Sequence, residues 1–224
     1  MNNGVGSPSH RTILGIPVWI IKTVPVVIVV VLAAFSVTVV STAQANKDNA
    51  SDSFSASAYA QKMYQSKLAP MVTRDAVDLA TLLTGLGADA AATQKKYGHA
   101  PGANSPYSFS IKTTGVAGAV NNSLLPLTVA GIDKPYTVYI QIGPDINGTA
   151  LRDATGLVSF GQFVNQIDYQ NAALALNDQV KDRVLKNLDP AALIGKSVTV
   201  TGVFTTGANP DFVGIVPVAI EVAP

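Results

Sequence analysis

The stretch GPDINGTALRDATGLVSFGQFVNQIDY, residues 143–169, differs from the rest of the chain and decides how the fold is interpreted. Valine, alanine, threonine and leucine dominate elsewhere, whereas this stretch gathers polar and charged residues among glycines: Asp145, Asn147, Arg152, Asp153, Asn165, Gln166 and Asp168. Glycine, asparagine and aspartate favour turns, because glycine adopts positive φ and the short polar side chains bond to nearby backbone. The stretch therefore predicts a connection between regular elements, which can also hold a ligand or a catalytic group.

The segments that precede this connection predict β-strands. YSFSIKTTGVAGAV, residues 107–120, alternates apolar and polar residues, which is typical of a half-buried strand. LLPLTVAG (124–131) and YTVYIQIG (136–143) predict two more. Glycines at 115, 118 and 202 allow strands to bend, as a small barrel requires.

A helix and two further strands follow the connection. YQNAALALNDQVKDRVLKNL, residues 169–188, predicts a helix whose apolar stripe comprises Ala172, Leu174, Leu176, Val180, Val184, Leu185 and Leu188. KSVTVTGVFTT (196–206) and VGIVPVAIEV (213–222) predict the last two strands. Three strands, a helix and two strands is the order of an OB-fold. We therefore expect an α+β protein whose residues 105–224 form a five-stranded OB-like Greek-key β-barrel, with the helix between strands 3 and 4 closing one barrel end.

A small helical segment, residues 58–100, is expected before the barrel. Its clearest helix is TRDAVDLATLLTGLG, residues 73–87, with Thr73 as the expected N-cap. The apolar face of this helix comprises Val77, Leu79, Leu82, Leu83 and Leu86. DAAATQKKYG predicts a shorter helix with Asp89 as its cap.

The amino-terminal region predicts export across a membrane. The segment from Ile13 to Val40 is strongly apolar, and Lys22 is its one charged residue. Such a segment can span a bilayer as a helix, and the basic residues before it place the amino terminus in the cytoplasm. We expect residues 1–45 to be a cytoplasmic tail with a single-pass signal anchor, or alternatively a signal peptide that is cleaved near Ala45. Residues 46–57 are expected to be a linker, and the barrel domain lies outside the cytoplasmic membrane in both cases.

Composition excludes several kinds of chemistry. The chain has no cysteine, which excludes disulfides, thiolate metal sites and a cysteine nucleophile. Its formal net charge is +1, so it lacks the basic surface of a nucleic-acid binder. His99 is the one histidine after the membrane segment, and Glu221 is the one glutamate, so histidine-assisted catalysis and an EF-hand calcium loop are disfavoured. We expect no catalytic residue, no metal site and no cofactor, and the protein is expected not to be an enzyme.

The motif QIGPDINGTALRDATGLVSFGQFVNQIDYQNAALALNDQV, residues 141–180, resembles a known family. It is similar to DUF2291, a bacterial family of predicted periplasmic lipoproteins of unknown function, whose members carry an IGP…GTALRDA…F…F.NQI signature. The resemblance covers roughly residues 55 to 222. It implies an extracytoplasmic OB-like domain with helices before it. It also implies that the gene lies near genes for sugar-uptake transporters. Family members are lipid-anchored through a cysteine that this chain lacks, so a protein anchor or free secretion must replace the lipid.

The polar residues of the connection leave two interpretations open. Arg152 and Asp153, with Asn165, Gln166 and Asp168, can form a site for a small ligand of unknown identity, in which Arg152 grips an anion. Alternatively, Arg152 pairs with an aspartate and the later residues cap the helix, so that all of them hold the fold. The expected function is a non-enzymatic binding or accessory domain, with a membrane transport system for sugars as its candidate partner. The alternative is an envelope protein-interaction module that has no small-molecule ligand.

Overall fold

The computed structural model describes residues 12–13, 16–17, 54–132 and 136–222. Two short strands, β1 (Thr12–Ile13) and β2 (Ile16–Pro17), pair antiparallel in the first unit of the chain, which ends at Ser53. The rest of the predicted membrane segment, the cleavage point at Ala45 and most of the linker lie outside the described residues. Within the described ranges, no helix combines the length and hydropathy that a membrane span requires.

Five strands of the second unit, residues 54–224, close into the predicted barrel. The strands are β5 (Ser108–Ala117), β6 (Leu124–Val129), β7 (Thr137–Gln141), β8 (Ser197–Thr205) and β9 (Phe212–Val222). The pairs β5–β6, β6–β7, β8–β9 and β5–β8 are antiparallel, whereas β7 and β9 are parallel. Two short strands, β3 (Val77–Asp78) and β4 (Gly98–His99), pair with the first half of β5, which β6 leaves uncovered.

Glycines let the barrel strands approach closely where the barrel bends. The β8–β9 register shifts between Thr201 and Gly202, and a Cβ at Gly202 would overlap the carbonyl oxygen of Val216. A Cβ at Gly115 would lie 2.5 Å from the carbonyl oxygen of Thr128. Both positions therefore require glycine for close approach, and at Gly202 the expected irregularity of the strand is confirmed by the register shift.

The barrel interior is one apolar core built from alternate strand residues. Register pairs Phe109 with Phe204, and their rings stack with centroids 5.5 Å apart. The other buried strand residues of this core are Ile111, Ala117, Leu125, Leu127, Val138, Ile140, Val198, Val200, Val213 and Ile215.

A helix that precedes the barrel enters this core, which corrects one expectation. Helix α5 (Leu79–Ala88) buries Leu79, Leu82 and Leu83 among the barrel residues. The long helix predicted to close the barrel, α8 (Gln166–Val180), buries its stripe in a separate core. An amphipathic pattern shows that one face of a helix is buried but does not show what that face packs against. The expectation that α8 closes the barrel was therefore wrong, and α5 enters the barrel core instead.

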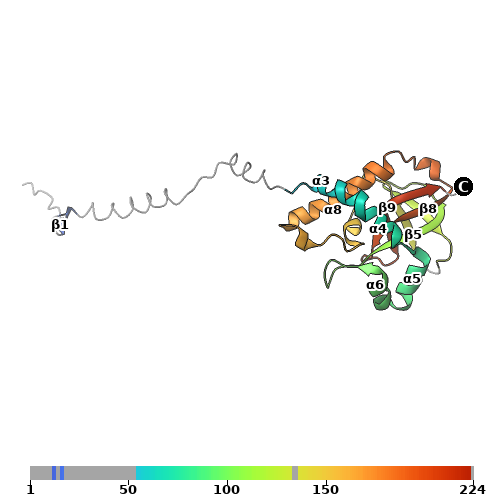
Figure 1. The fold of residues 1–224 in the computed structure, drawn as a ribbon, viewed down its shortest axis with the longest axis horizontal. Helices are drawn as coiled ribbons and strands as arrows, with labels where there is room; N and C mark the ends of the chain where they lie inside the picture. The colour runs from blue at the N-terminus through green and yellow to red at the C-terminus, as the bar shows by residue number, and fades with distance from the viewer. Residues whose placement is uncertain (1–11, 14–15, 18–53, 133–135, 223–224) are drawn as a thin grey trace, which may run out of the picture. The chain divides into compact units, whose positions relative to one another are not determined.

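The second core lies between helices and the outside of the barrel. Helix α3 (Ala56–Met63) continues through a π-helical turn, η1 (Tyr64–Leu68), into α4 (Ala69–Arg74). These helices pack with α7 (Ala150–Asp153), α8 and a second π-helical turn, η3 (Lys181–Leu185), against Val203 and Val216 of the barrel wall. In Figure 1, α3 and α8 lie together on one side of the strands, while α5 and α6 (Ala90–Tyr97) lie on another. Short 3-10 turns occur at Phe160–Gln162 (η2) and Ala191–Leu193 (η4).

Two further local predictions were wrong and one is confirmed. Thr73 lies inside α4 and donates to the Ala69 carbonyl, so the cap of α5 is Asp78, which accepts from the Thr81 amide at 2.8 Å. Leu174, expected in the buried stripe of α8, is exposed. Asp89 caps α6 as predicted, because its carboxylate accepts from the Ala92 amide at 3.0 Å.

Candidate functional site

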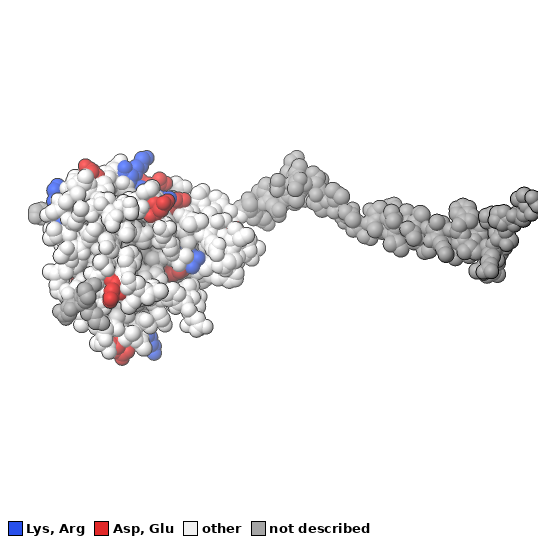
Figure 2. Space-filling view, turned by 180° about the vertical axis from the view of Figure 1, so that it is seen from behind, with Lys and Arg blue, Asp and Glu red and all other residues white. Residues whose placement is uncertain are grey.

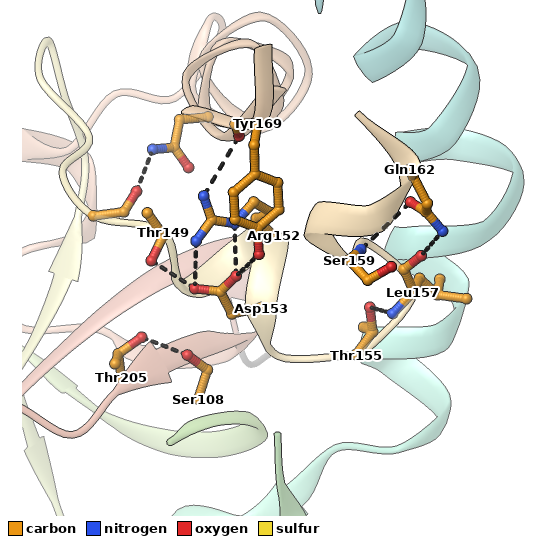
Figure 3. A network of polar contacts seen from close by, with 12 residues as sticks. Ser108, Thr149, Arg152, Asp153, Thr155, Leu157, Ser159, Gln162, Tyr169 and Thr205 are labelled. Carbon is orange, nitrogen blue, oxygen red and sulfur yellow. Dashed lines mark hydrogen bonds and ion pairs between the residues drawn. The ribbon is translucent and has the colours of Figure 1, made fainter. Parts of the chain in front are cut away.

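Arg152 and Asp153 form a buried ion pair on the short helix α7. Each residue is only 6% exposed. The Arg152 Nε donates to Asp153 Oδ1 at 2.6 Å, and Nη2 donates to Oδ2 at 3.1 Å. This two-point contact uses one edge of the guanidinium and both carboxylate oxygens, as Figure 3 shows.

Tyr169 and Thr149 complete the network around this pair. The Arg152 guanidinium carbon lies 3.6 Å from the centre of the Tyr169 ring, and Arg152 Nη1 donates to the Tyr169 carbonyl at 3.4 Å. Asp153 also accepts from the Thr149 hydroxyl at 2.6 Å and from the Tyr169 hydroxyl at 3.4 Å. Burial raises the pKa of Tyr169, so its hydroxyl stays a donor at neutral pH. Neighbours from two helices therefore surround the Arg152 guanidinium in the described structure.

The other predicted ligand residues lie at the start of α8. Asn165 is the N-cap: its side-chain oxygen accepts from the Asp168 amide at 2.9 Å, and its amide group donates to the Asp168 carboxylate at 3.0 Å. Gln166 is exposed. The structure thus brings together Arg152 with Asp153, and Asn165 with Asp168, in two separate clusters whose polar groups are used locally.

An aromatic cluster joins the buried network to the surface. The Tyr169 ring contacts Phe160 and Phe163, with centroids 5.7 and 5.4 Å apart. Phe163 in turn contacts Phe54 and Tyr59, at 5.2 and 5.3 Å. The cluster fixes the η2 turn and the start of α8 against α3, where the described domain begins.

Four exposed apolar side chains of residues 160–174, here called the apolar ridge, belong to the same stretch of chain. Its members are Val164, Ile167, Leu174 and Phe160, which are 93, 68, 60 and 50% exposed. Ile167 and Leu174 are seven residues apart, so they share the face of α8 opposite the buried Ala172 and Leu176. The ridge was not predicted, because the apolar stripe of this helix places Leu174 in the core; the seven-residue spacing of Ile167 and Leu174 was the available signal.

A groove lies on the other side of the same connection, outside β7 and β9. It has a volume of about 330 Å³ and is lined by Gln141, Asn147, Gly148, Thr149, Ala150, Thr205, Phe212 and Gly214. The Gln141 side-chain oxygen accepts from the Asn147 amide at 2.9 Å, which holds the loop over the strand. Phe212 is partly exposed and contacts Tyr139 with ring centroids 5.5 Å apart. The groove thus combines an aromatic face with amide and hydroxyl groups.

Charged groups are sparse around these features. Figure 2 shows basic and acidic side chains in a few small mixed groups, with broad uncharged surface between them. Among the described residues, no three His, Asp or Glu side chains gather closely enough to hold a metal ion.

Comparison with known proteins supports the fold and the family. An OB-fold protein from Thermotoga maritima, whose crystal structure is solved, is 22% identical, with a TM-score of 0.64 over 77% of this chain and 100% of that one. At this identity the likeness concerns the fold alone. No curated protein matches the sequence significantly. Residues 26–221 match a family described as predicted periplasmic lipoprotein (DUF2291), in agreement with the resemblance that the 141–180 motif carries. The chain therefore belongs to the DUF2291 family.

Proposed function

We propose that this chain is a non-enzymatic accessory module that is held at the outer face of the cytoplasmic membrane and binds a membrane-embedded protein through its apolar ridge. The observation that carries the proposal is the exposure of Phe160, Val164, Ile167 and Leu174 within one stretch of chain, residues 160–174, with Ile167 and Leu174 on the exposed face of α8. Soluble proteins rarely leave contiguous apolar surface uncovered, and larger patches mark contact sites. The family's description as periplasmic supports the location outside the membrane.

The buried network supports this role because it holds the ridge in place. Arg152 stacks on Tyr169, and Tyr169 packs against Phe160, which belongs to the ridge. A rigid apolar surface loses little conformational entropy when it binds, so a fixed platform favours affinity. The signature residues of the 141–180 motif are thereby explained without a ligand at Arg152.

The partner class follows from chain length and surface chemistry. The chain between an anchor that ends at residue 40 and the described domain that begins at residue 54 can span at most roughly 50 Å, so such a domain reaches only partners close to the membrane. No basic residue occurs between Phe160 and Leu174, and this favours an apolar protein surface over an anionic lipid surface. A solute transport system is the partner that we propose.

Site-directed cross-linking tests this function. Because the chain has no native cysteine, a maleimide reacts with the chain only at the introduced cysteine. Single variants Val164→Cys and Ile167→Cys of the full chain carry a photoactivatable maleimide in intact cells, with the exposed strand position Thr128→Cys as control. We expect both ridge positions, but not position 128, to cross-link to one membrane-embedded protein. A second substitution, Leu174→Asp, should abolish the cross-link, whereas Thr128→Asp should not.

Other cross-linking outcomes contradict the proposal. Cross-links to a second copy of this chain would assign the ridge to self-association. Cross-links to lipid alone would assign it to membrane contact. Equal labelling from position 128 would show that the ridge has no preference for a partner.

The groove beside Phe212 favours a second candidate function, the binding of a small polar ligand such as a sugar. Its aromatic face and amide groups are the kind of lining that orients such ligands. A thermal-shift screen of the full chain against neutral sugars tests it, because a ligand at about 100 times its dissociation constant adds about 2.7 kcal/mol of stability. We expect Phe212→Ala to remove any shift that a sugar produces; a shift that persists in this variant would place the ligand elsewhere.

A further inference from the structure

The two π-helical turns of the domain border one groove on the outer helical layer. Tyr64 of η1 and Arg183 of η3 both line it, and Val218 of β9 contributes to its wall. The groove has a volume of about 860 Å³, and its other lining residues are Gln65, Ala69, Pro70, Thr73, Arg74 and Val184. A π-helical turn shifts side chains from their ordinary helical positions and is frequent at functional sites.

Arg183 gives this groove a cation with free donors. Its Nε donates to the Gln179 side chain at 2.8 Å, and in the described part of the chain its terminal guanidinium nitrogens make no hydrogen bond and no ion pair. Arg74, on the α4 side, is bound at two points by Asp75, at 2.7 and 2.9 Å, so its charge is largely compensated. The uncompensated positive charge of the groove is therefore that of Arg183.

Tyr64 adds an unused donor beside it. The residue is 3% exposed, and its hydroxyl has no hydrogen-bond partner among the described residues. A buried hydroxyl without a partner is unfavourable, because the hydrogen bonds that it made to water are not replaced. Burial raises the pKa of Tyr64 to about 12 against the opposing charge of Arg183, so the group remains a neutral donor. Gln65 and Arg183, which are exposed, can change rotamer and admit a ligand to it.

We propose that this groove binds a small organic anion. Its carboxylate or phosphate group pairs with the Arg183 guanidinium and accepts a hydrogen bond from the Tyr64 hydroxyl. Its apolar body rests on the aliphatic walls formed by Ala69, Pro70, Val184 and Val218. A guanidinium that holds an oxyanion at two points, next to an apolar wall, selects for both parts of such a ligand.

This site is independent of the proposed function. It uses α4, η1 and η3, whereas the apolar ridge lies between Phe160 and Leu174, in η2, the loop after it and α8. A partner that covers the ridge and an anion in this groove can each exist without the other, so failure of one test leaves the other unaffected.

Calorimetric titration of the full chain in a neutral detergent tests the proposal. The probes are benzoate and phenyl phosphate, which carry both an anionic group and an apolar ring. Inorganic phosphate carries only the anionic group, and benzyl alcohol carries only the ring. We expect the two aromatic anions to bind, and phosphate and benzyl alcohol to bind at least about tenfold more weakly. Tighter binding of a short-chain phosphatidic acid than of phenyl phosphate would support the site and identify its natural ligand as a lipid headgroup.

Three variants separate specific recognition from general charge. Arg183→Gln should weaken the aromatic anions by about tenfold or more, as expected for loss of a charged hydrogen bond. Lys186→Gln, an exposed position in the next turn, removes the same charge and should leave binding unchanged. Tyr64→Phe removes a single oxygen and should weaken binding while the fold is retained, and this can be verified by the thermal unfolding midpoint.

The proposal is overturned by any of three results. The first is that the wild-type chain binds neither aromatic anion. The second is that Lys186→Gln weakens binding as much as Arg183→Gln does. The third is that benzyl alcohol binds as tightly as benzoate.

Discussion

A buried guanidinium is stable only where its neighbours replace the water that it loses. At Arg152 a carboxylate, an aromatic ring and a backbone carbonyl fill this role. The same Arg-Asp dipeptide occurs at Arg74 and Asp75 with the same two-point geometry, but there both side chains are exposed to solvent. The chain thus contains the same ion-pair geometry in a buried and an exposed environment, and burial decides how much each pair contributes to stability.

This contrast predicts unequal effects of two matched substitutions. Asp153→Ala should lower the free energy of unfolding by about 3–5 kcal/mol, because it leaves the Arg152 charge buried without a partner. Asp75→Ala should have a far smaller effect, since solvent screens an exposed pair. Urea unfolding of both variants, followed by circular dichroism, measures the difference. Equal losses of stability would show that the 152–153 pair is not buried as described.

Tyr64 predicts a loss of stability at alkaline pH. Its pKa is raised to about 12 in the folded protein, from 10.0 for a free tyrosine, so the folded state keeps the hydroxyl proton up to a higher pH than the unfolded state does. The resulting stabilisation is fully present below pH 10 and is lost as the pH rises through about 12. Tyr64→Phe has no proton to lose there, so we expect its stability to fall less than that of the wild type between these pH values, by up to about 2–3 kcal/mol. Parallel stability curves would contradict the burial of this hydroxyl.

At the level of single elements, strand patterns predicted the fold better than helix patterns did. The alternation at residues 107–111 and the strand order placed the five barrel strands, because a strand in a closed barrel has one face that must be apolar. The stripe of α8 predicted burial but not its partner, and the leucines that enter the barrel come from α5. The burial of α7 was likewise not encoded locally, since Arg152 and Asp153 are polar residues that are buried by elements distant in the sequence, α8 and the barrel strands. The sequence therefore showed where polar residues gather but not which of them are buried in the folded domain.

The first turn of α8 predicts a modest effect of its cap. Asn165→Ala removes the acceptor for the Asp168 amide, and losing such a cap costs about 1 kcal/mol. Gln166→Ala, one residue on and exposed, is the control and should be close to neutral. Thermal unfolding of the two variants gives the comparison. An Asn165→Ala midpoint equal to that of the control would show that this hydrogen bond is not formed in solution.

At the scale of the whole molecule, strands β8 and β9 belong to two cores at once. Val200 and Ile215 face the barrel interior, while Val203 and Val216 face the helical layer. The helices before the barrel contribute to both, since α5 enters the interior and α3 packs on the outer layer with α8. A wall that is apolar on both faces is stable in water only when both are covered, so the helical segment and the barrel should fold together.

Truncation tests this interdependence. A chain that begins at residue 54 retains every described element of the second unit and should unfold in one cooperative transition. A chain that begins at residue 105 lacks Leu79, Leu82 and Leu83 as well as α3 and α4, so it exposes one barrel end and much of the outer wall. We expect this shorter chain to lose cooperative unfolding and to expose hydrophobic surface, as measured by calorimetry and dye binding.

A point variant of the longer chain makes the same test quantitative. Leu82→Ala should lower the free energy of unfolding by about 2–5 kcal/mol, because it opens a cavity in the shared core. If residues 105–224 alone unfold cooperatively, and Leu82→Ala is nearly neutral, then the barrel is stable without its helical plug and the leucines of α5 only rest against it.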